Sequence, residues 1–102
     1  MTKRSPADRA AALAPLLKAL GDEHRLAMVM LLADGPRTVK EVQDATGLGQ
    51  TLVSHHLKAL REQGLVSATA HGRSNRYELC CEALAAPVRS LGELVASVQQ
   101  AA

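Results

Sequence analysis

Hydrophobic and polar residues recur along most of the chain with the spacing of amphipathic helices. In the stretch Gly49–Val66, the residues Leu52, Val53, Leu57 and Leu60 converge on one face of such a helix. The opposite face carries polar and basic side chains, namely Thr51, Ser54, His55, Lys58 and Arg61. The stretch therefore predicts a helix with one face in the core and one in solvent, a pattern also typical of ordinary surface helices.

A shorter helix is predicted immediately before this one. Thr38 followed by Glu41 forms a capping-box pattern, and Gly47 can adopt the left-handed conformation that ends a helix. Two helices joined by a tight glycine turn predict a helix-turn-helix over residues 38–63. The second helix of such a motif is shaped to enter the DNA major groove.

The residues after this motif have the pattern of a β-hairpin. Leu65–Ala70 and Tyr77–Cys80 predict two short strands, and His71–Arg76 between them predicts a basic, turn-rich tip. A hairpin over residues 65–80 would serve as a wing that reaches along the DNA backbone beside the recognition helix.

Two further helices are predicted before the motif. The first covers residues 8–20 with Ser5 as its N-cap, and we expect Pro15 to kink or divide it. The second is capped by Asp22 and is apolar on nearly all sides between residues 26 and 32. Such a helix is expected to be central and buried.

A last helix is predicted over residues 82–100, either kinked at Pro87 or preceded by a turn there. A heptad-like apolar stripe runs along it, formed by Leu84, Val88, Leu91, Val95 and Val98. This stripe would either cover the core of its own domain or contact a second protomer.

Composition favours contact with a second protomer. The chain has 102 residues with one Tyr and no Phe or Trp, and a single domain of this size buries only about 60 to 70% of its unfolded surface. A small domain with so few bulky residues commonly gains burial by dimerising.

Charge and targeting signals bound the function further. Residues 35–76 carry six Lys/Arg against three Asp/Glu, whereas residues 77–102 carry one against three. The basic segment is the one predicted to meet DNA.

No apolar run approaches the roughly 20 residues of a membrane span, and no signal peptide is recognisable. We therefore expect a cytoplasmic protein with no membrane partner.

Neither the cysteines nor the Ser-His pair indicates an enzyme. Cys80 and Cys81 are adjacent, which fits a reducing compartment and offers no disulfide framework. Ser54-His55 has no orienting acid in the motif, and no phosphate-cradling glycine loop is present. We expect no catalytic activity.

Three segments in this order, Leu17–Leu32, Thr51–Val66 and Gly72–Leu79, resemble the ArsR/SmtB family of bacterial winged-helix repressors. The resemblance implies a mainly α fold with a small β-hairpin, a winged helix-turn-helix in the order α-α-α-α-β-β-α. It implies one domain over residues 1–102, dimerised through its first and last helices. The implied interface consists of Leu13, Leu17, Leu84, Val88, Leu91, Val95 and Val98.

The resemblance also implies DNA-contacting positions. Those expected to face base edges are Gln50, Thr51, Ser54 and His55. Those expected to contact phosphates, with ordinary surface charge as the alternative, are Lys58, Arg61, Arg73 and Arg76. His56 is expected to pack sideways or to touch a phosphate. The expected partners are double-stranded DNA and a second copy of the chain, with a protein co-regulator as a further candidate.

The family commonly senses transition metals, but two familiar site patterns are missing. The helix before the turn has no Cys pair, and the last helix offers only Glu93 and no His. The remaining candidate ligands are Cys80, Cys81, His24, His71 and Glu82. They would bind nickel, zinc or cobalt, with a site shared between protomers left open and buried, inert cysteines as the alternative.

The expected function is a dimeric transcriptional regulator, a repressor, controlled by a transition metal or another small effector. The alternative is an interaction module, or a repressor without a sensor that relies on a partner protein.

Overall fold

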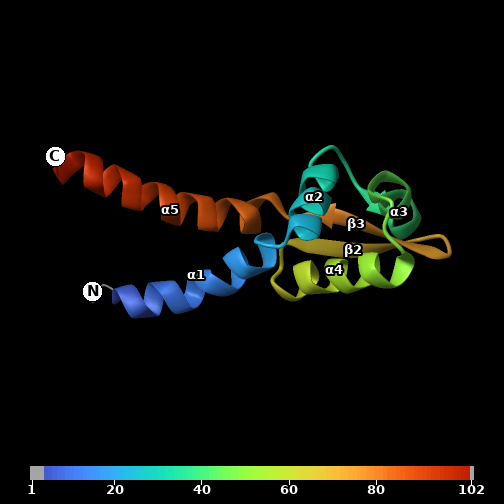
Figure 1. The fold of residues 1–102 in the computed structure, drawn as a ribbon, viewed down its shortest axis with the longest axis horizontal. Coiled ribbons are helices and arrows are strands. Elements are labelled where there is room, and N and C mark those ends of the chain that lie inside the picture. The colour runs from blue at the N-terminus through green and yellow to red at the C-terminus, as the bar shows by residue number, and fades with distance from the viewer. Residues whose placement is uncertain (1–3, 102) are drawn as a thin grey trace.

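The structure, a computed structural model, describes residues 4–101 and contains five helices and three strands in this part of the chain (Figure 1). In chain order these are α1 (Pro6–Leu20), α2 (Glu23–Leu32), β1 (Arg37–Thr38), α3 (Val39–Thr46), α4 (Gln50–Glu62), β2 (Val66–His71), β3 (Ser74–Leu79) and α5 (Cys81–Ala101). None of the described helices is long and apolar enough to span a membrane.

The sheet has three antiparallel strands in the order β1-β3-β2, not the two that the sequence predicted. Arg37 of β1 pairs with Tyr77 of β3, and Val66 of β2 pairs with Leu79. The element order is therefore α-α-β-α-α-β-β-α. β1 was missed because a strand of two residues is too short to show an alternating pattern.

The hairpin turn is much shorter than predicted. His71 pairs with Ser74, so only Gly72 and Arg73 form the turn, and Gly72 has a φ of 65°. Residues 74–76, assigned to the tip, belong to β3. Their polar character had indicated a loop, but this part of the hairpin is exposed on both faces, so polar residues are compatible with a strand here.

Helix α1 begins as predicted but is not divided. The Ser5 hydroxyl accepts a hydrogen bond from the Asp8 amide at 3.1 Å, and Pro6 occupies the first turn. The helix continues through Pro15 to Leu20. Pro15 has no amide to donate to the carbonyl of Ala11, and Ala11 is exposed so that water can satisfy that carbonyl.

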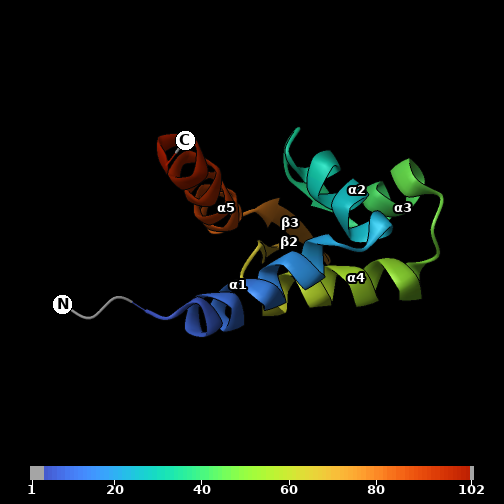
Figure 2. The same cartoon turned by 60° about the vertical axis from the view of Figure 1, so that its left-hand side comes forward.

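The core lies where α2, α3, α4 and the sheet meet (Figure 2). Its largest fully buried side chains include Met28, Leu57, Leu60 and Leu65. The prediction that α2 is buried all round is wrong, because Met30 is 62% exposed and Leu26 is 41% exposed. Met28, Val29 and Leu32 form its one buried face.

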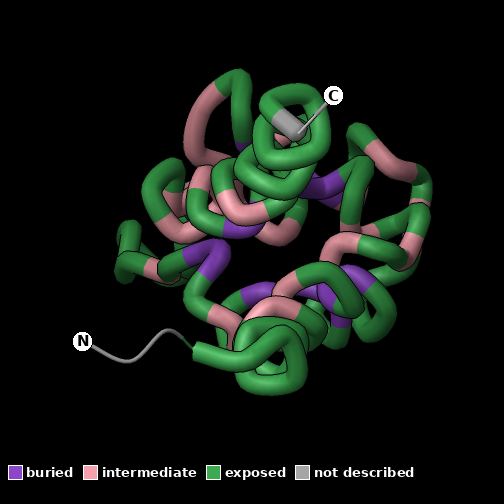
Figure 3. The backbone as a smooth tube through the Cα atoms, turned by 90° about the vertical axis from the view of Figure 1, so that its left-hand side faces the viewer, coloured by how far each residue is buried: buried purple, intermediate pink, exposed green. Residues whose placement is uncertain are grey.

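Helices α1 and α5 extend away from this core, toward the end of the molecule opposite the β2–β3 hairpin turn (Figure 1). The molecule measures 52 × 26 × 20 Å with a radius of gyration of 16.2 Å, whereas a compact domain of this length has about 13 Å. Pro87 is buried within the single helix α5, and the outer part of that helix is exposed along its length (Figure 3). The two helices thus present surface that their own domain does not cover.

Candidate nucleic-acid interface

The capping box and glycine turn form the predicted helix-turn-helix. The Thr38 hydroxyl accepts from the Glu41 amide at 3.2 Å, and the Glu41 carboxylate accepts from the Thr38 amide at 3.0 Å. The backbone hydrogen bond from Thr38 is the main cause that lowers the pKa of Glu41, with smaller contributions from the charges of Arg37 and Arg76. Gly47 ends α3 in the left-handed conformation at φ 75°.

The buried face of α4 differs from the predicted one by a residue. Val53, His56, Leu57 and Leu60 are buried, whereas Leu52, expected in the core, is 41% exposed. The observed set follows the i, i+3, i+4, i+7 spacing of one helical face, and Leu52 lies about 100° from Val53 around the helix. The prediction counted only apolar residues as core positions, so it included Leu52 and left out His56.

The opposite face of α4 is the polar surface that the sequence predicted. The exposed side chains there are Gln50, Thr51, Ser54, His55, Lys58 and Arg61. No acidic residue lies among them before Glu62. This surface offers hydrogen-bonding groups near the N-terminus of α4 and positive charge farther along.

Two arginines of the wing are exposed near the same end of the molecule. Arg73 lies in the hairpin turn, and Arg76 lies on β3 opposite Thr69 of β2 and Thr38 of β1. Figure 1 shows the hairpin turn and the N-terminal end of α4 at one end of the long axis. The free ends of α1 and α5 lie at the other.

His56 points into the protein, so the expectation that it touches a phosphate is wrong. It is 5% exposed. Its Nδ1 lies 3.4 Å from Nη1 of Arg25, and its Nε2 lies 4.0 Å from Oδ1 of Asp22. Nε2 has no hydrogen-bond partner within residues 4–101. Burial is the main cause that lowers the pKa of His56 from its ordinary 6.5.

Arg25 connects this histidine to the end of α1. Its Nε donates to the carbonyl of Ala19 at 2.6 Å, and Nη2 donates to the carbonyl of Lys18 at 3.4 Å. Asp22 caps α2 by accepting from the amides of His24 and Arg25, and the bond from Arg25 is the main cause that lowers its pKa. The spacing of Asp22 and Arg25 was visible in the sequence, but their contact with α4 was not.

The candidate metal ligands are dispersed. His24 and His71 are exposed at the start of α2 and the end of β2, whereas Cys80, Cys81 and Glu82 lie at the β3–α5 junction. Over residues 4–101, no three His, Cys, Asp or Glu side chains form a group that could hold a metal ion. The single chain therefore supplies no metal site from the predicted ligands in this part of the structure.

The alternative prediction, that both cysteines are buried and inert, is also wrong. Cys80 is partly exposed and Cys81 is exposed, and both are free thiols. The Cys80 amide donates to the Leu65 carbonyl at 2.8 Å, which fixes the backbone at this junction.

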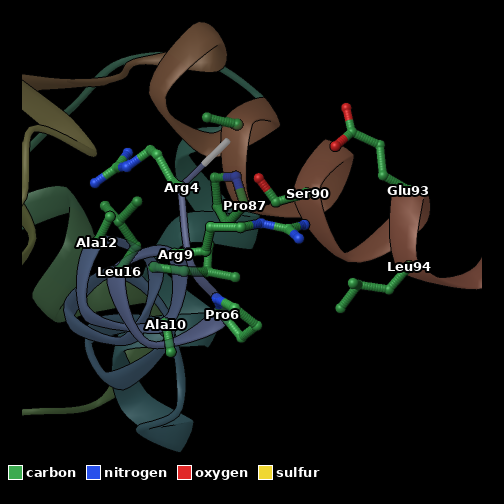
Figure 4. A pocket seen from close by; sticks show the side chains of 12 residues that line it. Arg4, Pro6, Arg9, Ala10, Ala12, Leu16, Pro87, Ser90, Glu93 and Leu94 are labelled. Atoms are coloured by element: carbon green, nitrogen blue, oxygen red, sulfur yellow. The ribbon is translucent and has the colours of Figure 1, made fainter. Parts of the chain in front are cut away.

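A groove of about 830 Å³ separates α1 from α5. Leu16 of α1 lies on one side of it, and Pro87 and Leu94 of α5 lie on the other (Figure 4). Leu13 of α1 also lines the groove. Arg9 also lines the groove.

Most residues predicted for a dimer interface are exposed. Val88, Leu91, Val95 and Val98 are between 41% and 70% exposed, and Leu17 is 37% exposed. Leu84 is an exception, because it is partly buried against its own core. It lies before Pro87, on the part of α5 that still contacts the domain.

Two sequence comparisons identify the family. The sequence profile described as "Bacterial regulatory protein, arsR family" matches residues 22–68. The chain is 44% identical over 87 residues to the HTH-type transcriptional regulator CmtR of Mycobacterium tuberculosis, covering 85% of this chain and 71% of that protein. The chain belongs to the ArsR family. Its relatives are transcriptional regulators rather than enzymes.

Two further relatives agree with this assignment. The HTH-type transcriptional repressor SmtB of M. tuberculosis is 41% identical over 70 residues, which cover 69% of this chain and 52% of the repressor. The solved structure of the homodimeric winged helix-turn-helix DNA-binding domain Mb0332 of Mycobacterium bovis matches with a TM-score of 0.71 and 34% identity, covering 95% of this chain and 91% of that one. The winged-helix fold expected for this ArsR-family regulator is confirmed.

Proposed function

We propose that this ArsR-family chain acts as a homodimeric repressor that binds a near-palindromic DNA site through α4 and the β2–β3 wing. The observation that carries the proposal is the exposed polar face of α4 at the same end of the molecule as the two wing arginines. In a helix-turn-helix, the start of the second helix contacts base edges.

The roles of the side chains follow from their chemistry. Gln50 at the start of α4 can pair with an adenine edge, and Thr51, Ser54 and His55 can exchange hydrogen bonds with several bases. The cations farther along the helix and on the wing suit phosphates, which hold the protein in register without reading sequence. These are Lys58, Arg61, Arg73 and Arg76.

The exposed apolar surface of α5 supports the dimer. Five large apolar residues beyond Pro87 stay exposed on one chain, and the groove between α1 and α5 is open. Full burial of an exposed side chain of this size stabilises by about 1.5–3 kcal/mol, and these side chains, which are between 41% and 70% exposed, would gain part of that each. A second copy that covers this surface would also place two recognition helices on one DNA duplex, and a homodimer is the stated form of the Mb0332 domain.

A transition metal remains the proposed effector, at a site that both protomers complete. Cys80 and Cys81 are accessible thiols between the wing and α5, so a metal bound there would act between the DNA-binding and dimerising parts. Nickel, zinc and cobalt suit mixed thiolate and imidazole ligands. Because residues 4–101 of one chain contain no metal-binding group of three, a partner protein that detects the signal is the second candidate.

The test is a binding titration on the DNA upstream of the protein's own gene. Fluorescence anisotropy at several salt concentrations should show a Kd that rises steeply with salt and a site at least 10³-fold preferred over a shuffled duplex, as is typical of specific regulators. Equal affinity for both duplexes would contradict a specific repressor. Parallel titrations with nickel, zinc and cobalt would identify any metal that changes the affinity.

A further inference from the structure

The neighbours of His56 determine where its ring carries a proton. A guanidinium group can only donate hydrogen bonds, so Nδ1 of His56, which lies 3.4 Å from Nη1 of Arg25, acts as the acceptor. The neutral ring therefore carries its proton on Nε2. That N–H faces Oδ1 of Asp22 across 4.0 Å, too far for a hydrogen bond. Arg25 is thus the one hydrogen-bond partner of this ring in the described structure.

The same guanidinium group closes the end of α1. It donates to the carbonyls of Ala19 and Lys18 while its remaining arm contacts His56 on α4. Because the donors of Arg25 form a rigid planar fork, its three contacts cannot change independently. The position of α4 is thus linked to the end of α1 through one side chain.

We propose that His56 is a positioning residue that ties the recognition helix to the end of α1 through Arg25, and does so only while its ring is neutral. This inference rests on the proposed function, in which α4 reads DNA and α1 belongs to the dimer interface. His56 itself contacts no DNA, because it faces the core. A proton on His56 would thus act as a signal that weakens the DNA binding of the proposed repressor.

Protonation would remove the acceptor that Arg25 uses. Nδ1 would then carry a proton, placing two donors and two positive charges 3.4 Å apart. The rings of His24 and His55 lie 5.6 and 5.4 Å from that of His56 and add positive charge when they are protonated. Asp22 is the one nearby group that favours the charged ring, from 4.0 Å. The charged ring would therefore move away from Arg25 and displace α4.

The direction of the pH effect follows from these neighbours. Burial first, and then the charges of Arg25, His55 and His24, lower the pKa of His56, while Asp22 raises it. Because the net shift is below the ordinary 6.5, the neutral ring stabilises the fold fully above about pH 6.5, and this contribution is lost as pH falls through the folded-state pKa.

The experiment compares operator affinity between pH 8 and pH 5.5 at constant salt for the wild type and three variants. His56→Asn keeps an acceptor near the position of Nδ1 but cannot be protonated. His56→Leu removes the acceptor. His24→Asn removes a neighbouring ring whose charge lowers the pKa of His56, while His56 and Arg25 themselves are kept. Circular dichroism confirms that each protein is folded at each pH.

We expect His56→Asn to bind like the wild type at pH 8 and to lose less affinity than the wild type between pH 8 and pH 5.5, because only the wild-type ring can take up a proton. In His24→Asn the loss of affinity should begin at a higher pH than in the wild type, because a charge that lowers the pKa of His56 is gone. His56→Leu should bind more weakly at every pH. Identical pH profiles of wild type and His56→Asn would overturn the inference. A wild type that does not bind specifically even at pH 8 would instead refute the proposed function.

A second measurement needs no variant that could misfold. Nitrogen NMR shifts of the imidazole rings in the wild-type dimer report the tautomer of each histidine. We expect the Nε2–H form for His56 at pH 8, with its pKa lowered from the ordinary 6.5. A Nδ1–H tautomer would overturn the inference, because Nδ1 could then not accept from Arg25.

Discussion

Removal of one wing arginine, Arg73→Ala, tests the DNA-binding surface quantitatively. Each protomer exposes four Lys/Arg side chains on α4 and the wing, at positions 58, 61, 73 and 76. If all of them contact phosphates, a dimer makes about eight such contacts, and the log–log slope of affinity against salt is near −7. Arg73→Ala removes two contacts per dimer and should reduce the slope to about −5.4.

The difference is large over an accessible salt range. Between 50 and 200 mM salt the wild type should lose roughly 2 × 10⁴-fold in affinity and the variant roughly 2 × 10³-fold. Fluorescence anisotropy on a labelled operator measures both slopes. Preference among operator sequences should not change, because phosphate contacts carry no sequence information.

Arg89→Ala is the matched control, since Arg89 is an exposed arginine on α5, which runs toward the end of the molecule opposite the hairpin turn (Figure 1). It removes the same charge and should leave the slope at its wild-type value. A wild-type slope in Arg73→Ala would show that the hairpin turn does not contact DNA. An equal reduction in both variants would show that net charge, rather than the wing, controls the salt dependence.

The other predictions concern the dimer, base reading and the thiols. Leu91→Glu should place carboxylates against the apolar surface of a second protomer, so sedimentation should show monomers; an intact dimer would exclude this interface. Gln50→Ala or Ser54→Ala should reduce discrimination at one base pair by about 1–3 kcal/mol, whereas an unchanged preference would remove that residue from base reading. A Cys80→Ser, Cys81→Ser double variant should lose metal affinity in calorimetry, and wild-type affinity would leave these cysteines without a role in sensing.

Local signals in the sequence were sufficient for most of the fold. Ser5, Thr38 and Gly47 end or begin helices through contacts within three or four residues, so their roles could be read from spacing alone. The exposed face of α4 could be found in the same way, because helical periodicity places polar residues opposite apolar ones.

The features that sequence reasoning missed depend on contacts between distant segments. β1 exists because Arg37 and Thr38 pair with β3, about forty residues later in the chain. The burial of His56 depends on Arg25, 31 residues earlier. Neither periodicity nor capping reports such contacts, and a histidine beside apolar residues has no pattern that separates a core position from a surface one.

The extended α5 described above makes the stability of this protein depend on its concentration. If a second protomer covers the apolar side of α5, folding is coupled to dimer formation. A higher protein concentration then shifts the equilibrium toward the folded dimer. The melting temperature should then rise as the protein is concentrated, whereas that of a self-contained monomer would stay constant. In a cell, the amount of protein made would set both how much repressor is assembled and how long each chain resists unfolding.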